Sequence, residues 1–320
     1  MRQLLAILFI CSSYVTLSAQ QPAQYSLYML NKFNWNPAYA GLDNSLSING
    51  VYRKQWSGLE GSPETQSLNA HLPVYILGGG MGIQVENDVL GPEHWTSANL
   101  AYSYQLDLDG KILSLGVSGG IVQREINGRL IRTPEGSYNS GEREHNDPSL
   151  PFDLESAITP TFNAGVYFQS EKLEAGLAMR HLNEATAEFG TFQLSLVRNY
   201  FFTLNSHFEL GRIFSIHPSV MVQSDATQTQ IDFSMLIQYD EKFFAGGSVR
   251  GYNTNSLDAA ALLMGYQLSE KLSVAYAYDF TLSALQNVSN GSHEIVVNYN
   301  LNQSIGKGRP PKIIYNPRSL

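Results

Sequence analysis

The sequence predicts an all-β protein: a transmembrane antiparallel up-and-down β-barrel of about 14 strands, with short periplasmic turns and longer outer loops. Charged residues make up only 15% of the chain, against roughly 25% in soluble domains, while Tyr (18) and Phe (15) are plentiful. Beyond residue 19, no segment approaches the ~18 consecutive apolar residues of a membrane helix, since the longest, 259–266, has 8. Alternating segments of about ten residues recur instead, and turn signals separate them.

The first 19 residues have the plan of a secretory signal peptide. Arg2 precedes an apolar run, and small residues end the segment, so we expect cleavage after Ala19. The only cysteine, Cys11, lies inside this signal, which leaves the mature chain without disulfides. Loss of Arg2 changes the net charge from −8 to −9, and this acidity argues against a nucleic-acid partner.

The strands are predicted from period-2 alternation. In 229–239, apolar residues at odd positions oppose mostly polar residues at even positions, as expected when the two faces of a strand meet different surroundings. The same criterion gives strands near 44–56, 65–74, 79–87, 94–107, 111–124, 158–169, 173–183, 195–209, 213–223, 229–239, 243–253, 256–268, 272–283 and 292–302.

Short and long connections alternate along the chain. Tight turns are predicted at 107–110, 170–173, 210–213, 240–243 and 269–272, and three of them share a Ser/Asp-Glu-Lys-apolar pattern. An even strand count then puts both ends of the barrel on the short-turn, periplasmic side. The predicted organisation is a signal peptide (1–19), a periplasmic N-terminal segment (20–43), an outer-membrane barrel (44–302) and a basic periplasmic tail (303–320).

A secreted soluble β-sandwich or barrel would alternate in the same way, because periodicity does not say whether the apolar face meets a core or lipid. The short–long alternation, the charges gathered in turns and the Tyr/Phe near strand ends favour the membrane barrel. Small residues on one face of the fifth predicted strand leave room for something inside the lumen: Ser114, Gly116, Ser118 and Gly120.

No motif indicates an enzyme. The seven histidines are scattered singly without H-x-x-H spacing, and no G-x-S-x-G elbow is present. The triplet 78–80 precedes a strand and is interpreted as a turn. We therefore predict no catalytic residue, no metal and no cofactor.

The longest break in the alternation, 125–157, is predicted to be an outer loop. Its charged centre is a candidate contact for Ca²⁺ or a partner, and the simpler interpretation is a solvated loop. The candidate outer-loop residues are Glu142, Arg143, Glu144, His145 and Asp147.

Two segments outside the strands are candidate partner-docking sites. The stretch 31–41, NKFNWNPAYAG, either docks a periplasmic partner or forms a rigid lead-in that closes the first strand against the last, packed at the rim or in the mouth of the barrel. Its candidate residues are Phe33, Trp35, Asn36, Pro37, Tyr39 and Gly41. The tail either docks periplasmic machinery or is a disordered end, and its candidates are Lys307, Arg309, Lys312 and Arg318.

Both ends of the chain resemble one known family. The opening QYSLYMLNKFNWNPAYAG (24–41) is similar to the Q-[FY]-S-x-Y-M-x-N…N-P-A-Y-A-G opening of the PorP/SprF family, with Leu27 where that family often has Gln. The closing YDFTLSALQNVSNGSHEIVVNY (278–299) resembles the Y-D…S…G-S-H-E-I ending of the same family. The resemblance implies an outer-membrane protein of the type IX secretion and gliding apparatus of Bacteroidota.

Three functions are therefore in competition. The resemblance implies a secretion accessory that supports export or cell-surface attachment of large adhesin-like cargo and contacts periplasmic components of the machine. A channel for small or hydrophobic solutes is the second, and a soluble secreted binding module is the third. The expected partners of the first are outer-membrane lipid, the secreted cargo and periplasmic type IX secretion components, with localisation in the outer membrane.

Overall fold

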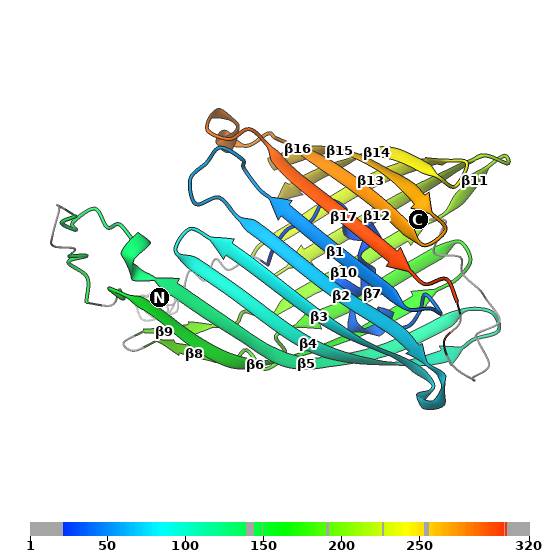
Figure 1. Cartoon of the computed structure of the whole chain (residues 1–320), viewed down its shortest axis with the longest axis horizontal. Coiled ribbons are helices and arrows are strands. Elements are labelled where there is room, and N and C mark those ends of the chain that lie inside the picture. Colours follow the sequence, from blue (N-terminus) through cyan, green and yellow to red (C-terminus); the bar gives the residue numbers. More distant parts are fainter. Residues whose placement is uncertain are drawn as a thin grey trace, which may run out of the picture.

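In a computed structural model the chain forms a closed barrel of 14 antiparallel strands, which confirms the predicted fold (Figure 1). The structure describes residues 22–138, 144–148, 150–189, 192–225, 227–252, 256–303 and 305, without the side chain of residue 192. The barrel strands are β1 (Ser47–Lys54), β2 (Glu64–Val74), β3 (Gly79–Leu90), β4 (Glu93–Asp107), β5 (Ile112–Asn127), β6 (Leu154–Gln169), β7 (Leu173–Arg180), β10 (Asn199–Ser206), β12 (Phe214–Ser224), β13 (Thr229–Tyr239), β14 (Phe243–Tyr252), β15 (Ser256–Ser269), β16 (Leu272–Thr281) and β17 (Ser292–Asn300).

Each barrel strand pairs with the strands that precede and follow it around the wall. β1 pairs with β17, so the two ends of the sheet meet and the barrel has no free edge. β10 pairs with β7 on one side and β12 on the other, while the short β11 (Phe208–Leu210) extends the pairing of β12 beyond β10. Among the described residues, no helix has both the length and the apolar character needed to cross a bilayer.

The two ends of the barrel differ in their connections. At the short-turn end the strands are joined by the tight turns predicted from the sequence, and at the long-loop end by connections such as 55–63 and 282–291. In outer-membrane barrels these ends face the periplasm and the outside, respectively. Three short 3-10 helices lie in the connections: η3 (Tyr75–Leu77), η4 (Gly128–Leu130) and η5 (Ala284–Asn287).

A strand pair outside the barrel wall was not predicted. The connection between β7 and β10 contains a separate hairpin of β8 (Thr186–Phe189) and β9 (Phe192–Ser195), which projects beyond the wall at the long-loop end (Figure 1). Ala187 and Phe189 are buried with Ile126, so this hairpin packs on the extended end of β5.

The wall is apolar outside and polar inside. Leu100, at the middle of β4, is 67% exposed on the outer face, and the odd-numbered apolar residues of β13 are exposed as well. The residues that alternate with them, such as Ser103 and Ser234, are fully buried. Because the polar face points to the lumen, the periodicity belongs to a membrane barrel and not to a soluble barrel with an apolar core.

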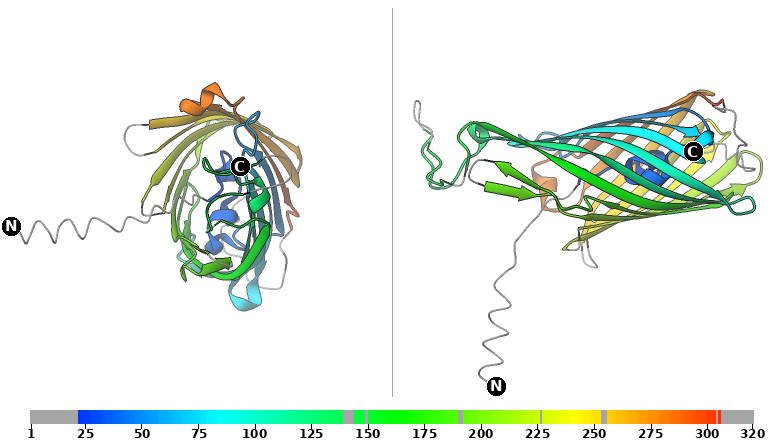
Figure 2. Two further views of the ribbon diagram at one scale, coloured as in Figure 1. Left: turned by 90° about the vertical axis from the view of Figure 1, so that its left-hand side faces the viewer. Right: turned by 90° about the horizontal axis from the view of Figure 1, so that it is seen from below.

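Residues 22–46 lie inside the lumen and form a plug. Three short helices, η1 (Tyr28–Leu30), α2 (Lys32–Trp35) and η2 (Pro37–Tyr39), follow one another within the barrel, where Figure 2 shows them enclosed by the wall. Of the two predicted placements, at the rim or in the mouth of the barrel, the structure agrees with the second, and residues 22–43 extend from the mouth through the lumen. The closure of the first strand against the last is made by β1 and β17 themselves.

Candidate functional site: the plugged lumen

The wall carries glycines where the backbone of the plug comes closest. A Cβ on Gly116 of β5 would overlap the backbone of Ala38, and one on Gly80 of β3 would overlap the carbonyl of Ala40. These positions need glycine because they meet another backbone directly. The predicted space beside Gly116 is thus filled by the plug.

Aromatic side chains fill the remaining space around α2 and η2. Trp35 is only 2% exposed, and its ring lies 5.3 Å from the ring of Tyr25 and 5.4 Å from that of Phe201. Tyr39 makes an edge contact with Tyr167, with 5.0 Å between ring centroids. Such pairs contribute roughly 0.5–1.5 kcal/mol each beyond the area they bury.

Asn36 connects the plug to the wall through its side chain. Its amide nitrogen donates to the carbonyls of Val166 at 2.9 Å and Leu177 at 3.1 Å, and its oxygen accepts from the Ala38 N–H at 2.9 Å. The backbone of Asn36 is extended, as expected for a residue before proline. One amide therefore caps η2 and also satisfies two carbonyls of the wall.

The six predicted docking residues of 31–41 are all buried inside the barrel. Gly41 has a φ of +75° and its Cα touches the wall beside Gly80, so it serves the close approach as well as the turn. Buried side chains offer no surface to a periplasmic protein, so docking on these residues does not fit this structure. The residues concerned are Phe33, Trp35, Asn36, Pro37, Tyr39 and Gly41.

A buried ionic cluster, which we call the latch, holds the first residues of the plug. It joins one plug residue to five inward-facing residues of β1, β13, β14, β16 and β17, and its members are Ser26, Arg53, Asp232, Arg250, Asp279 and Glu294.

Within the latch, Glu294 accepts hydrogen bonds from the backbone N–H groups of Ser26 at 2.7 Å and Leu27 at 3.0 Å. The Ser26 hydroxyl donates to Asp279 at 2.7 Å. Arg53 forms ion pairs with Asp279 at 2.7 Å and Glu294 at 2.9 Å. The two carboxylates therefore bind the plug and the wall arginine at the same time.

Arg250 completes the latch from the opposite side. Its guanidinium pairs with Asp232 at 2.6 Å and with Asp279 at 3.3 Å, and it donates to the backbone carbonyl of Tyr25 at 3.2 Å. The latch thus holds three carboxylates against two guanidiniums. The ion pairs themselves join wall residues, and the plug is held by the hydrogen bonds of Ser26, Leu27 and Tyr25 to these charged groups, each worth about 1.5–3 kcal/mol.

The plug runs along the whole lumen. The side-chain oxygen of Gln24 accepts a hydrogen bond at 3.1 Å from Gln55, which follows β1 at the long-loop end. Near the other end, Asp43 accepts from Tyr39 at 2.7 Å and from Ser47, the first residue of β1, at 2.5 Å. The described chain therefore starts near the long-loop end, descends inside the barrel and turns into β1 at the short-turn end.

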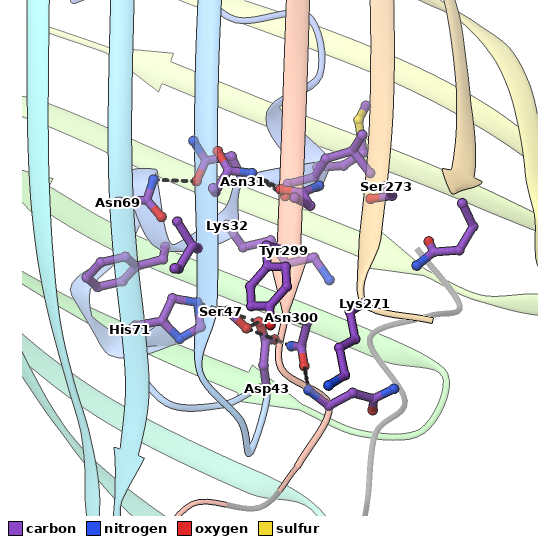
Figure 3. Close-up of a pocket in the computed structure, with 18 of the residues that line it drawn as sticks. Asn31, Lys32, Asp43, Ser47, Asn69, His71, Lys271, Ser273, Tyr299 and Asn300 are labelled. Atoms are coloured by element: carbon purple, nitrogen blue, oxygen red, sulfur yellow. Dashed lines mark hydrogen bonds and ion pairs between the residues drawn. The ribbon is translucent and has the colours of Figure 1, made fainter. Parts of the chain in front are cut away.

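A small cavity of about 100 Å³ lies beside the plug at the short-turn end (Figure 3). Its lining is rich in asparagine, and Asn31 of the plug accepts a hydrogen bond from Asn69 of β2 at 2.8 Å. Lys32 points into the same region and also pairs with Glu174 of β7 at 2.7 Å. At this end of the lumen, as at the latch, polar side chains therefore hold the plug to the wall.

Three of the five predicted outer-loop residues lie among the described residues, and they differ in exposure. His145 is buried, with its ring stacked on Phe152 at 5.1 Å, so it belongs to the packing of the loop and not to its surface. Glu144 and Asp147 are exposed. The predicted contacts Glu142 and Arg143 lie outside the described residues.

The four basic residues predicted in the tail, Lys307, Arg309, Lys312 and Arg318, also lie outside the described residues. The chain that leads to them leaves β17 at the short-turn end, where the Gln303 N–H donates to Ser45 at 3.1 Å. Among the described residues, no group of three or more His, Cys, Asp or Glu is arranged to hold a metal ion.

Sequence reasoning missed the latch as a unit, although its signal was present. Arg53, Asp232 and Arg250 are charged residues at lumen-facing positions within membrane-spanning strands, where an ionised group needs a partner. Asp279 and Glu294 were noted only as part of a closing motif.

Fold and site together define an outer-membrane β-barrel whose lumen is occupied by its own N-terminal segment. The sequence identifies the family: residues 17–299 match the profile described as Type IX secretion system membrane protein PorP/SprF. Since the match spans nearly the whole chain, the protein belongs to the PorP/SprF family.

Solved structures with a similar fold are outer-membrane proteins of very different sequence. They include Omp33 of Acinetobacter baumannii (6% identity, 80% of this chain and 97% of that chain, TM-score 0.47) and the toluene transporter TbuX of Ralstonia pickettii (10%, 86% and 93%, 0.49). The CymD monoaromatic hydrocarbon channel is a third (12%, 88% and 94%, 0.49). No curated protein sequence matches the chain.

Proposed function

We propose that this protein is a non-enzymatic accessory of type IX secretion and gliding that supports export or surface attachment of large adhesin-like cargo. In this proposal the long-loop end holds the cargo and the short-turn end contacts periplasmic components. Membership of the PorP/SprF family supports the link to type IX secretion. The observation that carries the choice of role is the occupied lumen, with residues 22–46 latched inside the barrel.

An occupied lumen weighs against the alternative, a channel for small or hydrophobic solutes. Passage along the barrel axis would require the plug to move, and movement would break the contacts of Ser26 with Asp279 and Glu294. It would also withdraw Asn36 from two wall carbonyls. A protein that works through its two end surfaces needs no such movement.

The three carboxylates of the latch also support a non-enzymatic role. The latch carboxylates Asp232, Asp279 and Glu294 are each engaged by an arginine, which leaves none of them free for proton transfer. They act as structural partners of the plug.

The basic tail is the proposed periplasmic contact. It follows residue 303, which is held at the short-turn end, and its four cations would meet an acidic or anionic surface there. The other candidate contact, 31–41, is no longer part of this proposal because it is buried.

Deletion of the gene tests the role. We expect one or a few large surface proteins to be retained in the cell or released unattached, as seen by fractionation and mass spectrometry of surface, medium and cell. Complementation with Lys307, Arg309, Lys312 and Arg318 all changed to Gln should restore barrel levels but not cargo attachment. Unchanged surface proteins together with lost solute uptake would support the channel.

A control with the same change of charge is available on the same side of the membrane. Each of four tight turns at the short-turn end contributes one lysine: Lys111, Lys172, Lys242 and Lys271. Changing these four to Gln should leave cargo attachment intact. Equal loss in both quadruple variants would show that net charge matters and that the tail is not a specific contact.

A further inference from the structure

A second cavity, which we call the outer cavity, lies above the latch at the long-loop end. Its volume is about 370 Å³, which falls within the range of ligand pockets (~300–1,000 Å³) and exceeds the space needed for isolated waters. Its lining includes the latch residues Arg53, Arg250 and Asp279, together with Gln24, Trp56 and Asp258.

Asp258 is aimed into the outer cavity by a β-bulge. In the pairing of β14 with β15, Arg250 lies opposite Ala259, and the next residue, Gly251, lies opposite Leu257. Asp258 is therefore an extra residue of β15 that has no pairing partner on β14. A bulge re-aims a side chain and occurs preferentially at barrel rims and binding sites. Here it makes Asp258 part of the cavity lining.

The carboxylate of Asp258 forms no ion pair among the described residues. Arg250 lines the same cavity and attracts it at longer range, but the guanidiniums of Arg53 and Arg250 are each paired with latch carboxylates. Its Oδ2 is buried, and no donor among the described residues lies within hydrogen-bonding distance of it. A buried acceptor without a donor costs about 1–3 kcal/mol, more when charged, so this oxygen would gain from a cationic donor.

Trp56 also lines the outer cavity and suits the same kind of ligand. It has a φ of +46°, which is strained for a bulky residue and is held by a hydrogen bond from its N–H to Ser292 at 3.1 Å. An indole face attracts a cation by roughly 0.5–2 kcal/mol.

We propose that the outer cavity binds the side chain of an arginine or lysine presented by a protein at the outer surface. The cation would pair with Asp258 and lie near Trp56. This proposal rests on the proposed function and specifies the chemistry by which cargo would be held. A bare Ca²⁺ ion is a poorer occupant because it needs six to eight oxygen ligands, and the described residues provide no carboxylate group of that kind.

Removal of the Asp258 charge separates a binding role from a structural role. Since the carboxylate contributes no ion pair to the folded barrel, Asp258→Asn should leave the melting temperature unchanged or raise it. If Asp258 instead stabilised the folded barrel, Asp258→Asn would lower the melting temperature. The matched control is Glu60→Gln, which removes an exposed acid from the loop 55–63 at the same end.

The binding test uses the full mature chain in detergent and the capped peptide acetyl-Gly-Gly-Arg-Gly-Gly-amide, with saturation-transfer NMR as the readout. We expect the arginine peptide to bind, its alanine analogue not to bind, and Asp258→Asn to weaken binding at least about tenfold, which corresponds to about 1.4 kcal/mol. Glu60→Gln should bind like the unmodified protein. Equal binding of both peptides, or undiminished binding by Asp258→Asn, would overturn the proposal.

Cell experiments distinguish failure of the outer-cavity proposal from failure of the proposed secretion-accessory function. If gene deletion releases cargo and Asp258→Asn does so too at normal barrel levels, both stand. If deletion releases cargo and Asp258→Asn does not, the outer cavity is not the attachment site although the accessory role holds. If deletion leaves cargo in place, the accessory role fails, whatever the peptide does.

Discussion

The latch makes the position of the plug testable through one side chain, Glu294. This carboxylate receives three donors: the N–H groups of Ser26 and Leu27 and the guanidinium of Arg53, at 2.7, 3.0 and 2.9 Å. Glu294→Gln keeps the shape but leaves one acceptor oxygen, and its new NH₂ group faces at least one of the donors. We expect the plug to leave the lumen more often while the barrel stays closed.

The magnitude follows from the two hydrogen bonds that Glu294 accepts from the plug. The ion pair with Arg53 joins two wall residues, so its loss affects the barrel equally whether the plug is inside or displaced. Hydrogen bonds to a charged group contribute about 1.5–3 kcal/mol each, and two at the lower figure give about 3 kcal/mol. This corresponds to roughly a hundredfold rise in the population with the plug displaced.

The assay uses a reporter cysteine. The only cysteine of the sequence lies in the predicted signal peptide, so Met29→Cys would be the single thiol of the mature chain. Met29 is buried in the plug, and the smaller cysteine fits its space. Maleimide labelling of this thiol, when plug movement is fast relative to labelling, reports the displaced population.

The control replaces a matched but exposed pair. Lys54 and Glu64 lie 3.1 Å apart on neighbouring strands, with about a third of each side chain exposed, and such pairs contribute at most about 1 kcal/mol. The Met29→Cys protein that also carries Glu64→Gln should therefore react with maleimide at the same rate as the protein that carries Met29→Cys alone. The reasoning is refuted if Glu294→Gln labels no faster than Glu64→Gln.

Three further changes test the wall, the lipid face and the buried tyrosines. Gly116→Leu should displace the plug without preventing barrel closure, because its side chain would occupy the place of Ala38; fast labelling of the same reporter thiol with normal heat-modifiable migration would show this. Leu100→Arg should cost about 2–4 kcal/mol, measured as a lower urea midpoint, since Leu100 lies on the lipid face at the middle of β4; an unchanged midpoint would contradict that placement. Burial raises the pKa of Tyr25 and of Tyr39 above the usual value of 10, so the folded state holds these protons more tightly and stability should fall as pH rises above about 10. Thermal melting against pH should show this fall, and Tyr25→Phe should make it shallower.

The strands were predictable because each face of a membrane barrel meets a different medium along its whole length. The predicted strand 229–239 coincides with β13 residue for residue, and three of the five tight turns fall where Glu-Lys pairs interrupt the alternation. The hairpin of β8 and β9 was not predicted because its strands have four residues each, too few for alternation to stand out.

The position of the plug was not predictable in the same way. The small residues of β5 indicated room in the lumen, and Gly116 does meet Ala38, but a segment without periodicity does not reveal whether it lies inside or beneath a barrel. The latch depends on contacts between residues more than 200 positions apart, such as Ser26 with Asp279.

The latch also changes what the two terminal motifs mean. The opening motif that carries the family resemblance contains Ser26, and the closing motif contains Asp279 and Glu294; in the fold these three residues form one buried contact. These three residues therefore hold the plug, and all three are buried. Under the proposed function, recognition of a particular cargo would use groups that face the long-loop end. Asp258 and Trp56 in the outer cavity meet that condition, whereas the buried aromatic residues of 31–41 do not.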